Sequence, residues 1–338
     1  MALATTWFFI WALLWAVYFM TDGFDLGVGA LLPFLAKDET EKRIMYNATG
    51  PVWDGNEVWL IAAGGVTFAA FPRTYAVMFS TFHEALTLLL LALSIRGISF
   101  ELRSKVASAS ARKLCDLCQF LGSTLVAVLL GVAFANIFQG LRIVNGVHQG
   151  TILTLLNPYA LAGGIFFLSM FLLHGALWLA IRTAGDLHTR ATRTAAVLWR
   201  LVLAVAAAFL IYTAFATHLY DNYLRRPILF VVPLLAVGAL IAVRIFLGKA
   251  RFWSAWLASA VMIVATTFFG FIGLYPNMLP SVIDPQANSI VFHQAASGPL
   301  TLKIMLGVVA FFVPLAVLYQ LWAYRMFSDK VNPSELVY

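Results

Sequence analysis

Residues 53–71 read Trp-Asp-Gly-Asn-Glu-Val-Trp followed by Leu-Ile-Ala-Ala-Gly-Gly-Val-Thr-Phe-Ala-Ala-Phe, a polar heptad that opens a long apolar run. A helix of this length, at about 1.5 Å per residue, can cross the roughly 30 Å hydrocarbon core of a bilayer. A charged side chain at membrane depth costs roughly 2.5–3.5 kcal/mol on insertion scales, so it usually serves a function and faces protein or water. Asp54 and Glu57 are therefore the first candidate functional groups.

The composition of the whole chain is that of a membrane protein. Of 338 residues, 62% are hydrophobic and 11% are charged, whereas about a quarter of a soluble domain is charged. Repeated long apolar runs predict an all-α, polytopic fold, because a helix satisfies its own backbone hydrogen bonds inside a bilayer. The net charge of +7 comes from scattered residues that form no basic block, so no nucleic-acid partner is predicted.

Nine transmembrane helices are predicted, at 7–35, 53–71, 75–99, 117–138, 157–182, 197–218, 227–247, 253–275 and 299–325. Seventeen of the 22 Lys and Arg residues follow odd-numbered spans and five follow even-numbered ones. The positive-inside rule then places the N-terminus outside and the C-terminus in the cytoplasm. Spans two and three are expected to be antiparallel neighbours, because only a short turn containing Pro72 joins them. No connection has room for a soluble domain, so residues 1–338 are predicted to form a single integral-membrane domain.

Acidic residues gather in the first three spans. They form two pairs spaced i,i+3, in which both side chains share one helix face, and a fifth that stands alone. By helical rise, the pair in span two lies at the cytoplasmic end, the pair in span one lies deeper, and the fifth lies about 13 Å from the outer face. Acids at such depths are typical of proton relays. We interpret all five as a proton path: Asp54, Glu57, Asp25, Asp22 and Glu84.

A structural interpretation of the same acids remains open. Asp54 precedes an apolar run and is followed three residues later by Glu57, which resembles a capping box. The acids could also pair with Arg96 and Arg103 to fix helix packing. Glu84 has no helix end to cap within the predicted third span, which favours the relay for this residue.

No metal or cofactor site is predicted on this chain. His83 and His174 lie in predicted spans, but a lone intramembrane histidine more often packs through hydrogen bonds than ligates a haem. Cys115 and Cys118 form a single C-x-x-C pair, without the second pair of a zinc site or a thioredoxin-like context. Three indoles recur on one side of the first span, and we expect them to contact lipid: Trp7, Trp11 and Trp15.

Dense motifs in the first three spans resemble subunit II of the cytochrome bd-type quinol oxidases. The first motif is Thr21-Asp22-Gly23-Phe24-Asp25-Leu26-Gly27-Val28-Gly29. The second is Asn47-x-Thr49-Gly50-Pro51-Val52-Trp53-Asp54-Gly55-Asn56-Glu57-Val58-Trp59-Leu60. Two shorter motifs continue the resemblance, Gly64-Gly65-x3-Ala69-Ala70-Phe71-Pro72-x2-Tyr75-Ala76 and Arg96-Gly97-x2-Phe100-Glu101-x-Arg103. Together they lie within residues 18–105, and the remaining spans match the family in number and size.

The resemblance implies two four-helix bundles plus one further helix, in the cytoplasmic membrane of a bacterium or an archaeon. It implies an enzyme complex that oxidises membrane quinol and reduces O2 to water, contributing to the proton gradient without pumping. Two b-type haems and one d-type haem are expected on subunit I, the partner in a heterodimer, and no catalytic residue is expected on this chain. Membrane lipids, quinone and a small single-helix subunit are further expected partners.

Three residues match functional positions of that family. Asp54 matches a proposed site of proton uptake on the cytoplasmic side, and Asp25 matches the second Asp of the first-span signature. Trp59 matches a position that lines a proposed lateral O2 route. Glu84 lies outside every matched motif, so its role depends on the depth argument alone.

The alternative function is a stand-alone proton-coupled transporter that uses the acids as its coupling site. Discontinuous helices and an inverted repeat mark that class. Gly27, Gly29 and Pro33 indicate a possible break in the first span, but no matching break occurs in the second half of the chain.

Overall fold

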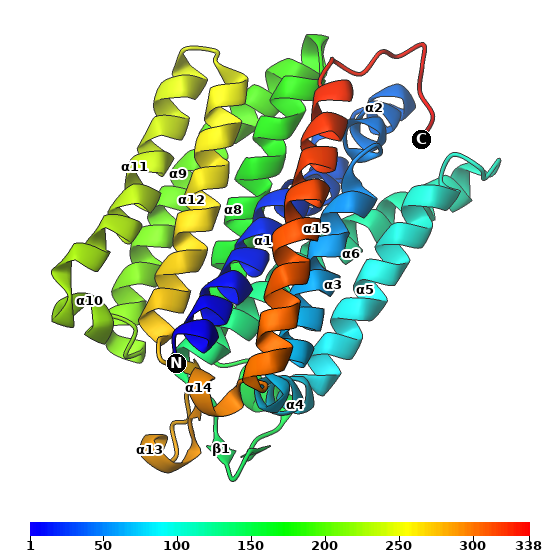
Figure 1. Ribbon diagram of the computed structural model, residues 1–338. Helices are drawn as coiled ribbons and strands as arrows, with labels where there is room; N and C mark the ends of the chain where they lie inside the picture. The colour runs from blue at the N-terminus through cyan, green and yellow to red at the C-terminus, as the bar shows by residue number, and fades with distance from the viewer.

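Long helices account for most of the chain, so the fold class is all-α, as predicted (Figure 1). The computed structural model describes residues 1–338. The helices are α1 (Ala2–Leu35), α2 (Glu39–Thr49), α3 (Trp53–Ala70), α4 (Pro72–Thr81), α5 (His83–Leu102), α6 (Ala109–Gln139), α7 (Ile152–Leu155), α8 (Pro158–Arg182), α9 (Gly185–Ala216), α10 (Asp221–Arg225), the 3-10 helix η1 (Pro227–Phe230), α11 (Val231–Gly248), α12 (Phe252–Leu274), α13 (Pro285–Asn288), α14 (Phe292–Ala295) and α15 (Pro299–Met326).

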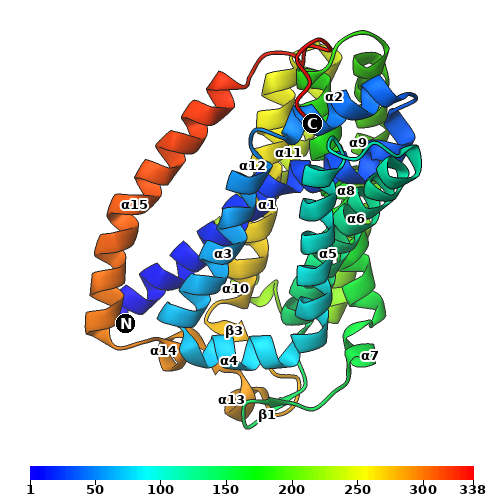
Figure 2. The ribbon, with the colours of Figure 1, turned by 90° about the vertical axis from the view of Figure 1, so that its right-hand side faces the viewer.

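The long helices run between two ends of the molecule. One end carries α2 and the C-terminus, and we call it the α2 end; the other carries α4 and the small strands, and we call it the α4 end (Figures 1 and 2). Eight helical segments are long and apolar enough to cross a membrane: α1, α5, α6, α8, α9, η1 with α11, α12 and α15. α3, the predicted second span, is 18 residues long, but its first turn carries Asp54, Asn56 and Glu57 and makes it more polar.

α1 runs obliquely through the middle of the molecule (Figures 1 and 2) and packs against α3, α6, α8 and α12. Its contact with α8 depends on two glycines. A methyl group at Gly27 would lie 1.9 Å from the backbone oxygen of Phe171, and one at Gly175 would lie 2.6 Å from the backbone carbon of Gly27. Only residues without a side chain let the two backbones approach this closely, as is common between membrane helices.

The predicted third span is two helices, not one. α4 begins at Pro72, a position where proline fits the first turn because its missing N–H has no partner there. A second break follows at Phe82, where no proline or glycine marks it. α4 crosses from the last residues of α3 to the start of α5 (Figure 2). α3 and α5 run in opposite directions and meet through side chains such as Trp53 and Phe100, whose rings lie 5.1 Å apart. The expected single short turn between them is wrong, because α4 joins them.

Two small antiparallel sheets connect the helices at the α4 end. β1 (Ile143–Val144) pairs with β2 (Val147–His148), with Val144 opposite Val147. Asn145 and Gly146 both have positive φ, the conformation that closes a two-residue hairpin. β3 (Asn277–Leu279) pairs with β4 (Ile290–Val291), with Asn277 opposite Val291.

The indole stripe of the first span faces protein rather than lipid. Trp7 and Trp11 are 0% and 1% exposed, and Trp15 is also buried. Trp7 Nε1 donates to the backbone oxygen of Leu302 at 3.0 Å, and Trp11 Nε1 donates to Thr67 Oγ1 at 2.7 Å. The expectation of lipid contact is wrong because α1 is the central helix and its indole stripe faces other helices, whereas Leu13 on the same helix is 45% exposed.

α15 stands at the edge of the molecule and leaves most of its surface uncovered (Figure 2). Only Leu302 of this helix is buried. Large apolar side chains are also exposed on α3 and α5, including Ile61 and Leu90. The surface formed by α3, α5 and α15 is thus apolar and open.

Candidate functional site: a buried acidic cluster

Two acids of α1 lie at the centre of a polar cluster between α1, α3 and α5. Asp22 and Asp25 are 0% and 1% exposed. Asp22 is joined to Glu57 of α3 through Arg96 of α5, and Asp25 is joined to α3 through Asn56. Three of the five predicted path residues therefore meet in one place, as their spacing on two helix faces allowed.

Arg96 is the cation of this cluster. It is 1% exposed, its Nη1 pairs with Glu57 Oε1, and its Nη2 lies 3.5 Å from Asp22 Oδ1. Gly122 of α6 leaves room for it, because a methyl group there would lie 3.0 Å from the Arg96 Cβ. A buried charge requires partners of opposite sign, and the acids pair with Arg96 as the structural interpretation describes.

Asn56 links the cluster to α15. Its Nδ2 donates to Asp25 Oδ2 at 2.6 Å, and its Oδ1 accepts from Gln320 Nε2 at 2.7 Å and from the Tyr324 hydroxyl at 2.8 Å. Gln320 Oε1 in turn accepts from Trp59 Nε1 at 2.9 Å. A network of five side chains thus joins three helices that are far apart in sequence.

Each of the two α1 carboxyls keeps one oxygen without a partner in the chain. These atoms are Asp22 Oδ2 and Asp25 Oδ1. Buried polar atoms of this kind are where internal water binds, and a carboxyl oxygen can also take up a proton. The chemistry that the cluster can perform is therefore proton exchange at buried carboxyls.

Asp54 and Glu84 lie outside this cluster. Asp54 is exposed in the first turn of α3, whose N-cap is Val52 with no side-chain cap. The capping-box interpretation of Asp54 is wrong, because the helix begins one residue before it. Glu84 is exposed in the first turn of α5, about 18 Å along the helix from Arg96. The argument that Glu84 has no helix end nearby is wrong too, because α5 starts at His83.

His174 is buried and makes its hydrogen bonds within the chain. Both ring nitrogens of His174 are hydrogen bonded, Nδ1 with Ser259 Oγ at 2.6 Å and Nε2 with the Met20 backbone oxygen at 3.0 Å. Its ring stacks on Trp256 at 5.1 Å. No ring nitrogen of His174 is free to ligate a haem iron, and no group of three His, Cys, Asp or Glu side chains is placed to hold a metal ion.

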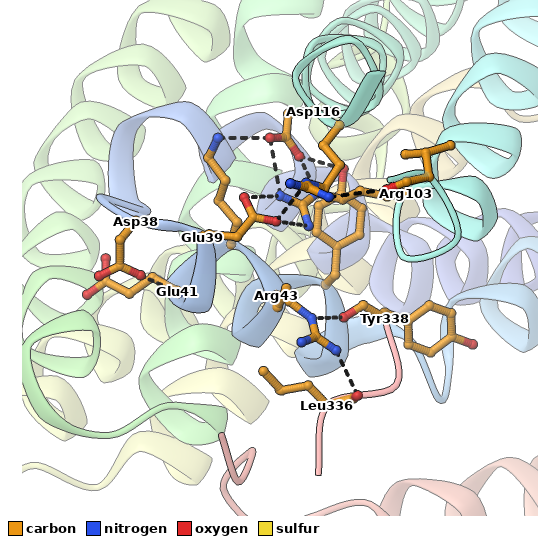
Figure 3. A network of polar contacts seen from close by, with 12 residues as sticks. Asp38, Glu39, Glu41, Arg43, Arg103, Asp116, Leu336 and Tyr338 are labelled. Atoms are coloured by element: carbon orange, nitrogen blue, oxygen red, sulfur yellow. Dashed lines mark hydrogen bonds and ion pairs between the residues drawn. The ribbon is translucent and has the colours of Figure 1, made fainter. Parts of the chain in front are cut away.

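A second ionic network covers the α2 end beside the cluster (Figure 3). Arg103 Nε lies 2.5 Å from Asp116 Oδ1, and Arg103 Nη1 lies 3.1 Å from Glu39 Oε1. Lys42 adds a contact of 2.8 Å to Asp116. Burial, together with the Asp116 carboxylate, raises the pKa of Tyr46, whose hydroxyl donates to Asp116. Arg103 therefore pairs with acids that hold α2 and α6 together, not with the predicted path.

The C-terminal residues are held against α2 next to the start of α3 (Figure 3). Arg43 donates to the backbone oxygens of Leu336 and Tyr338 at 2.9 and 3.0 Å. Asn47 Oδ1 accepts from the backbone N–H groups of Val337 and Tyr338 at 2.9 and 3.2 Å. The Tyr338 ring rests on Gly50, where a methyl group would lie 2.4 Å from it. The tail thus packs against the segment that leads into α3.

Sequence reasoning missed the contribution of α15. Gln320 and Tyr324 are spaced i,i+4, so they share one face of that helix. Gln320 is the one amide in the apolar run 299–326, and a polar side chain within a membrane helix is a signal for a buried partner. The signal was available, but the sequence gives no means of pairing Gln320 with a residue 264 positions away.

The fold and the cluster together define an α-helical integral membrane protein with ionisable groups buried between its helices. Ionisable groups in such positions are rare and usually functional. The chain belongs to the cytochrome bd terminal oxidase subunit II family, whose model matches residues 3–327. The family expected from the motifs is confirmed, and membership makes the chain a subunit of an oxidoreductase complex that contains haem.

Curated relatives and a solved structure agree over nearly the whole chain. A probable cytochrome oxidase subunit 2 of Haemophilus influenzae is 36% identical, with 96% of this chain and 95% of the relative covered. The cytochrome bd-I ubiquinol oxidase subunit 2 of Escherichia coli K12 is 35% identical, with 97% and 96% covered. The cytochrome bd ubiquinol oxidase subunit 2 of Bacillus subtilis is 32% identical, with 97% of each covered. A chain of the bd oxidase from Geobacillus thermodenitrificans has the same fold, with a TM-score of 0.79, 18% identity, and 97% and 99% covered.

Proposed function

We propose that this chain is subunit II of a respiratory oxidase that oxidises membrane quinol and reduces O2 to water, and that it delivers protons to that reaction. The relatives from Escherichia coli and Bacillus subtilis are named as ubiquinol oxidase subunits, which supports the reaction. The observation that carries the proton role is the cluster of Asp22, Asp25, Glu57 and Arg96 buried between three helices. The reaction contributes to the proton gradient without pumping.

The proposed topology has nine transmembrane helices, namely the eight long apolar segments and α3. α3 runs from the α2 end to the α4 end, and its 18 residues span about 27 Å, close to the thickness of the hydrocarbon core. The N-terminus then lies outside and the C-terminus with the α2 end lies in the cytoplasm of a bacterial or archaeal cell. The whole chain is one domain of two four-helix bundles, α1, α3, α5, α6 and α8, α9, α11, α12, with α15 as the further helix.

The proposed proton path begins at Asp54, which is exposed at the cytoplasmic start of α3. Glu57 follows one turn deeper and half-buried, and Arg96 connects it to Asp22. Asp25 lies one turn from Asp22 on the same face of α1. Glu84, at the opposite end of α5, is proposed only as a terminal member, because no side-chain contact links it to the cluster.

We further propose that the two b-type haems and the d-type haem are bound by subunit I. The engaged nitrogens of His174 and the position of His83 on the exposed start of α5 support this assignment. The apolar surface of α3, α5 and α15 is the proposed face for subunit I, and Trp59 on α3 is proposed to line the O2 route there. Quinone, lipids and a small single-helix subunit complete the proposed set of partners.

Asp25→Asn and Glu57→Gln in the purified complex test the proton role. Each change keeps the shape of the side chain and removes its ability to exchange a proton, so we expect quinol oxidase turnover to fall by roughly a hundredfold with haem content unchanged. Asp54→Asn should lower turnover less, because an exposed acid at a path entrance can be bypassed by water. Asp186→Asn, which alters an exposed acid at the start of α9, is the matched control. Full turnover in both Asp25→Asn and Glu57→Gln would refute the path.

An absorption spectrum separates the oxidase from the alternative of a stand-alone proton-coupled transporter. Haem absorption in the chain purified with its native partners, and none in the chain alone, is the expected result. A preparation without haem in either case would support the transporter.

A further inference from the structure

The hydrogen bonds around Asn56 have a direction that one side chain sets. The indole N–H of Trp59 can donate and cannot accept. It contacts Gln320 at 2.9 Å, so the atom that Gln320 turns toward it must be the amide oxygen. The amide nitrogen of Gln320 therefore faces Asn56, where it donates to Oδ1 at 2.7 Å.

The same reasoning fixes the amide of Asn56. Its Oδ1 accepts from Gln320 and from the Tyr324 hydroxyl at 2.8 Å, so both lone pairs are used. The NH2 group must then point the other way, toward Asp25 Oδ2 at 2.6 Å. Rotating the amide by half a turn would bring its NH2 against the NH2 of Gln320, so that two donors face each other, and its oxygen against a carboxylate. Asn56 is fully buried, so no solvent is at hand to satisfy the rotated amide.

We infer that Trp59, Gln320 and Tyr324 are positioning residues that hold the Asn56 amide with its NH2 on Asp25 Oδ2, so that Asp25 exchanges its proton at Oδ1. This inference rests on the proposed function, in which Asp25 belongs to the proton path. Asp25 Oδ1 is buried and has no partner in the chain, which leaves it as the oxygen available for exchange. Trp59 then acts through its N–H group, and not only through the bulk of its ring.

Replacement of Trp59 by residues that keep either the N–H or the bulk separates these roles. Trp59→His retains a ring N–H at nearly the position of the indole nitrogen but is smaller, whereas Trp59→Phe keeps an apolar aromatic wall and loses the donor. The measurement is steady-state oxygen consumption by the purified two-subunit complex, with kcat and KM for O2 obtained separately. We expect kcat to fall in the order wild type, Trp59→His, Trp59→Phe. KM for O2 should stay unchanged in Trp59→Phe, which keeps the aromatic wall of the proposed O2 route. The loss in Trp59→Phe should be roughly two- to tenfold, the range that one hydrogen bond of ordinary strength implies.

Changes on α15 should reproduce this effect. Gln320→Met interrupts the series of hydrogen bonds from Trp59 to Asn56 and should lower kcat by a similar factor. The double variant Trp59→Phe/Gln320→Met should lose no more activity than the more affected single variant. Tyr324→Phe should have a smaller effect, since Gln320 still fixes the amide. Trp253→Phe is the matched control, because this indole of α12 is 41% exposed and lies outside the surface of α3, α5 and α15; it should leave both constants unchanged. Haem absorbance is recorded for every variant to confirm assembly.

Two results would overturn the inference. One is a kcat for Trp59→Phe equal to or above that of Trp59→His, which would assign Trp59 a role through bulk alone. The other is a wild-type kcat for Gln320→Met, which would show that the amide needs no positioning. Either failure is distinguishable from failure of the proton path itself, because the latter appears as full turnover in both Asp25→Asn and Glu57→Gln.

Discussion

Replacing Arg96 by methionine removes the single cation of the buried cluster while keeping a long apolar side chain in its place. Arg96 is 1% exposed, and its two acidic partners differ: the side chain of Asp22 is 0% exposed and that of Glu57 is 23% exposed. Removing one partner of a buried ion pair typically destabilises a protein by about 3–5 kcal/mol, because the remaining charge is left without compensation. Most of the loss should come from Asp22, since Glu57 can recover part of its hydration.

The assay is denaturant titration of the purified complex in detergent, followed by haem absorbance and intrinsic fluorescence. We expect the free energy of unfolding of Arg96→Met to fall by about 3–5 kcal/mol. The double variant Arg96→Met/Asp22→Asn should regain roughly 2 kcal/mol, because it removes the charge that was left alone. The matched control is Lys105→Met, where the lost contact to Glu101 is 3.5 Å long and the two side chains are 66% and 48% exposed. Its effect should stay below about 1 kcal/mol.

Equal stabilities of Arg96→Met and Lys105→Met would refute the reasoning. Such a result would mean that Asp22 and Glu57 are neutral in the folded complex and that Arg96 packs without an ionic role. A loss in the double variant as large as in the single one would equally show that Asp22 carries none of the effect.

Three further predictions concern packing, the tail and the buried histidine. Gly27→Ala should destabilise the complex by roughly 1–3 kcal/mol, since its methyl group would lie 1.9 Å from the Phe171 oxygen. Gly238→Ala on α11, with nothing within 4 Å, should not; equal melting temperatures would contradict this. Asn47→Ala should speed amide hydrogen exchange at Val337 and Tyr338 by roughly tenfold, because one hydrogen bond to each N–H is lost. Mass spectrometry measures the exchange, and unchanged rates would mean that Asn47 does not hold the tail. His174→Phe should lower the free energy of unfolding by roughly 1–3 kcal/mol, because Ser259 Oγ loses its histidine partner. Haem absorbance should be unaltered, because no haem ligand is removed. A missing haem band would contradict the assignment of haems to subunit I.

The positions of the apolar spans can be predicted from the sequence because they depend on local composition. Bilayer thickness sets the length of a membrane helix, and hydropathy along the chain reports it directly. The i,i+3 spacing of Asp22 and Asp25 likewise places both on one helix face by geometry alone. Only one of the two breaks around α4 can be predicted from the sequence. Pro72 marks the first, but no proline or glycine marks the second at Phe82.

The partners of each polar side chain were decided by the tertiary structure. In a membrane protein both the lipid-facing and the protein-facing sides of a helix are apolar, so the sequence does not tell which side of α1 is buried. For this reason the stripe of Trp7, Trp11 and Trp15 was assigned to lipid, although it faces other helices. For the same reason Asp54 and Glu57, three residues apart on one helix, could not be separated into an exposed acid and a paired one.

The sequence by itself therefore determined that this chain is a helical membrane protein of a known family, and that acids lie within its apolar helices. Only the tertiary structure decided that Arg96 joins Glu57 to Asp22 and that α15 orients Asn56 toward Asp25. The physical reason is that helix formation and membrane insertion are properties of a continuous segment, whereas a hydrogen-bond network depends on which faces of distant helices meet.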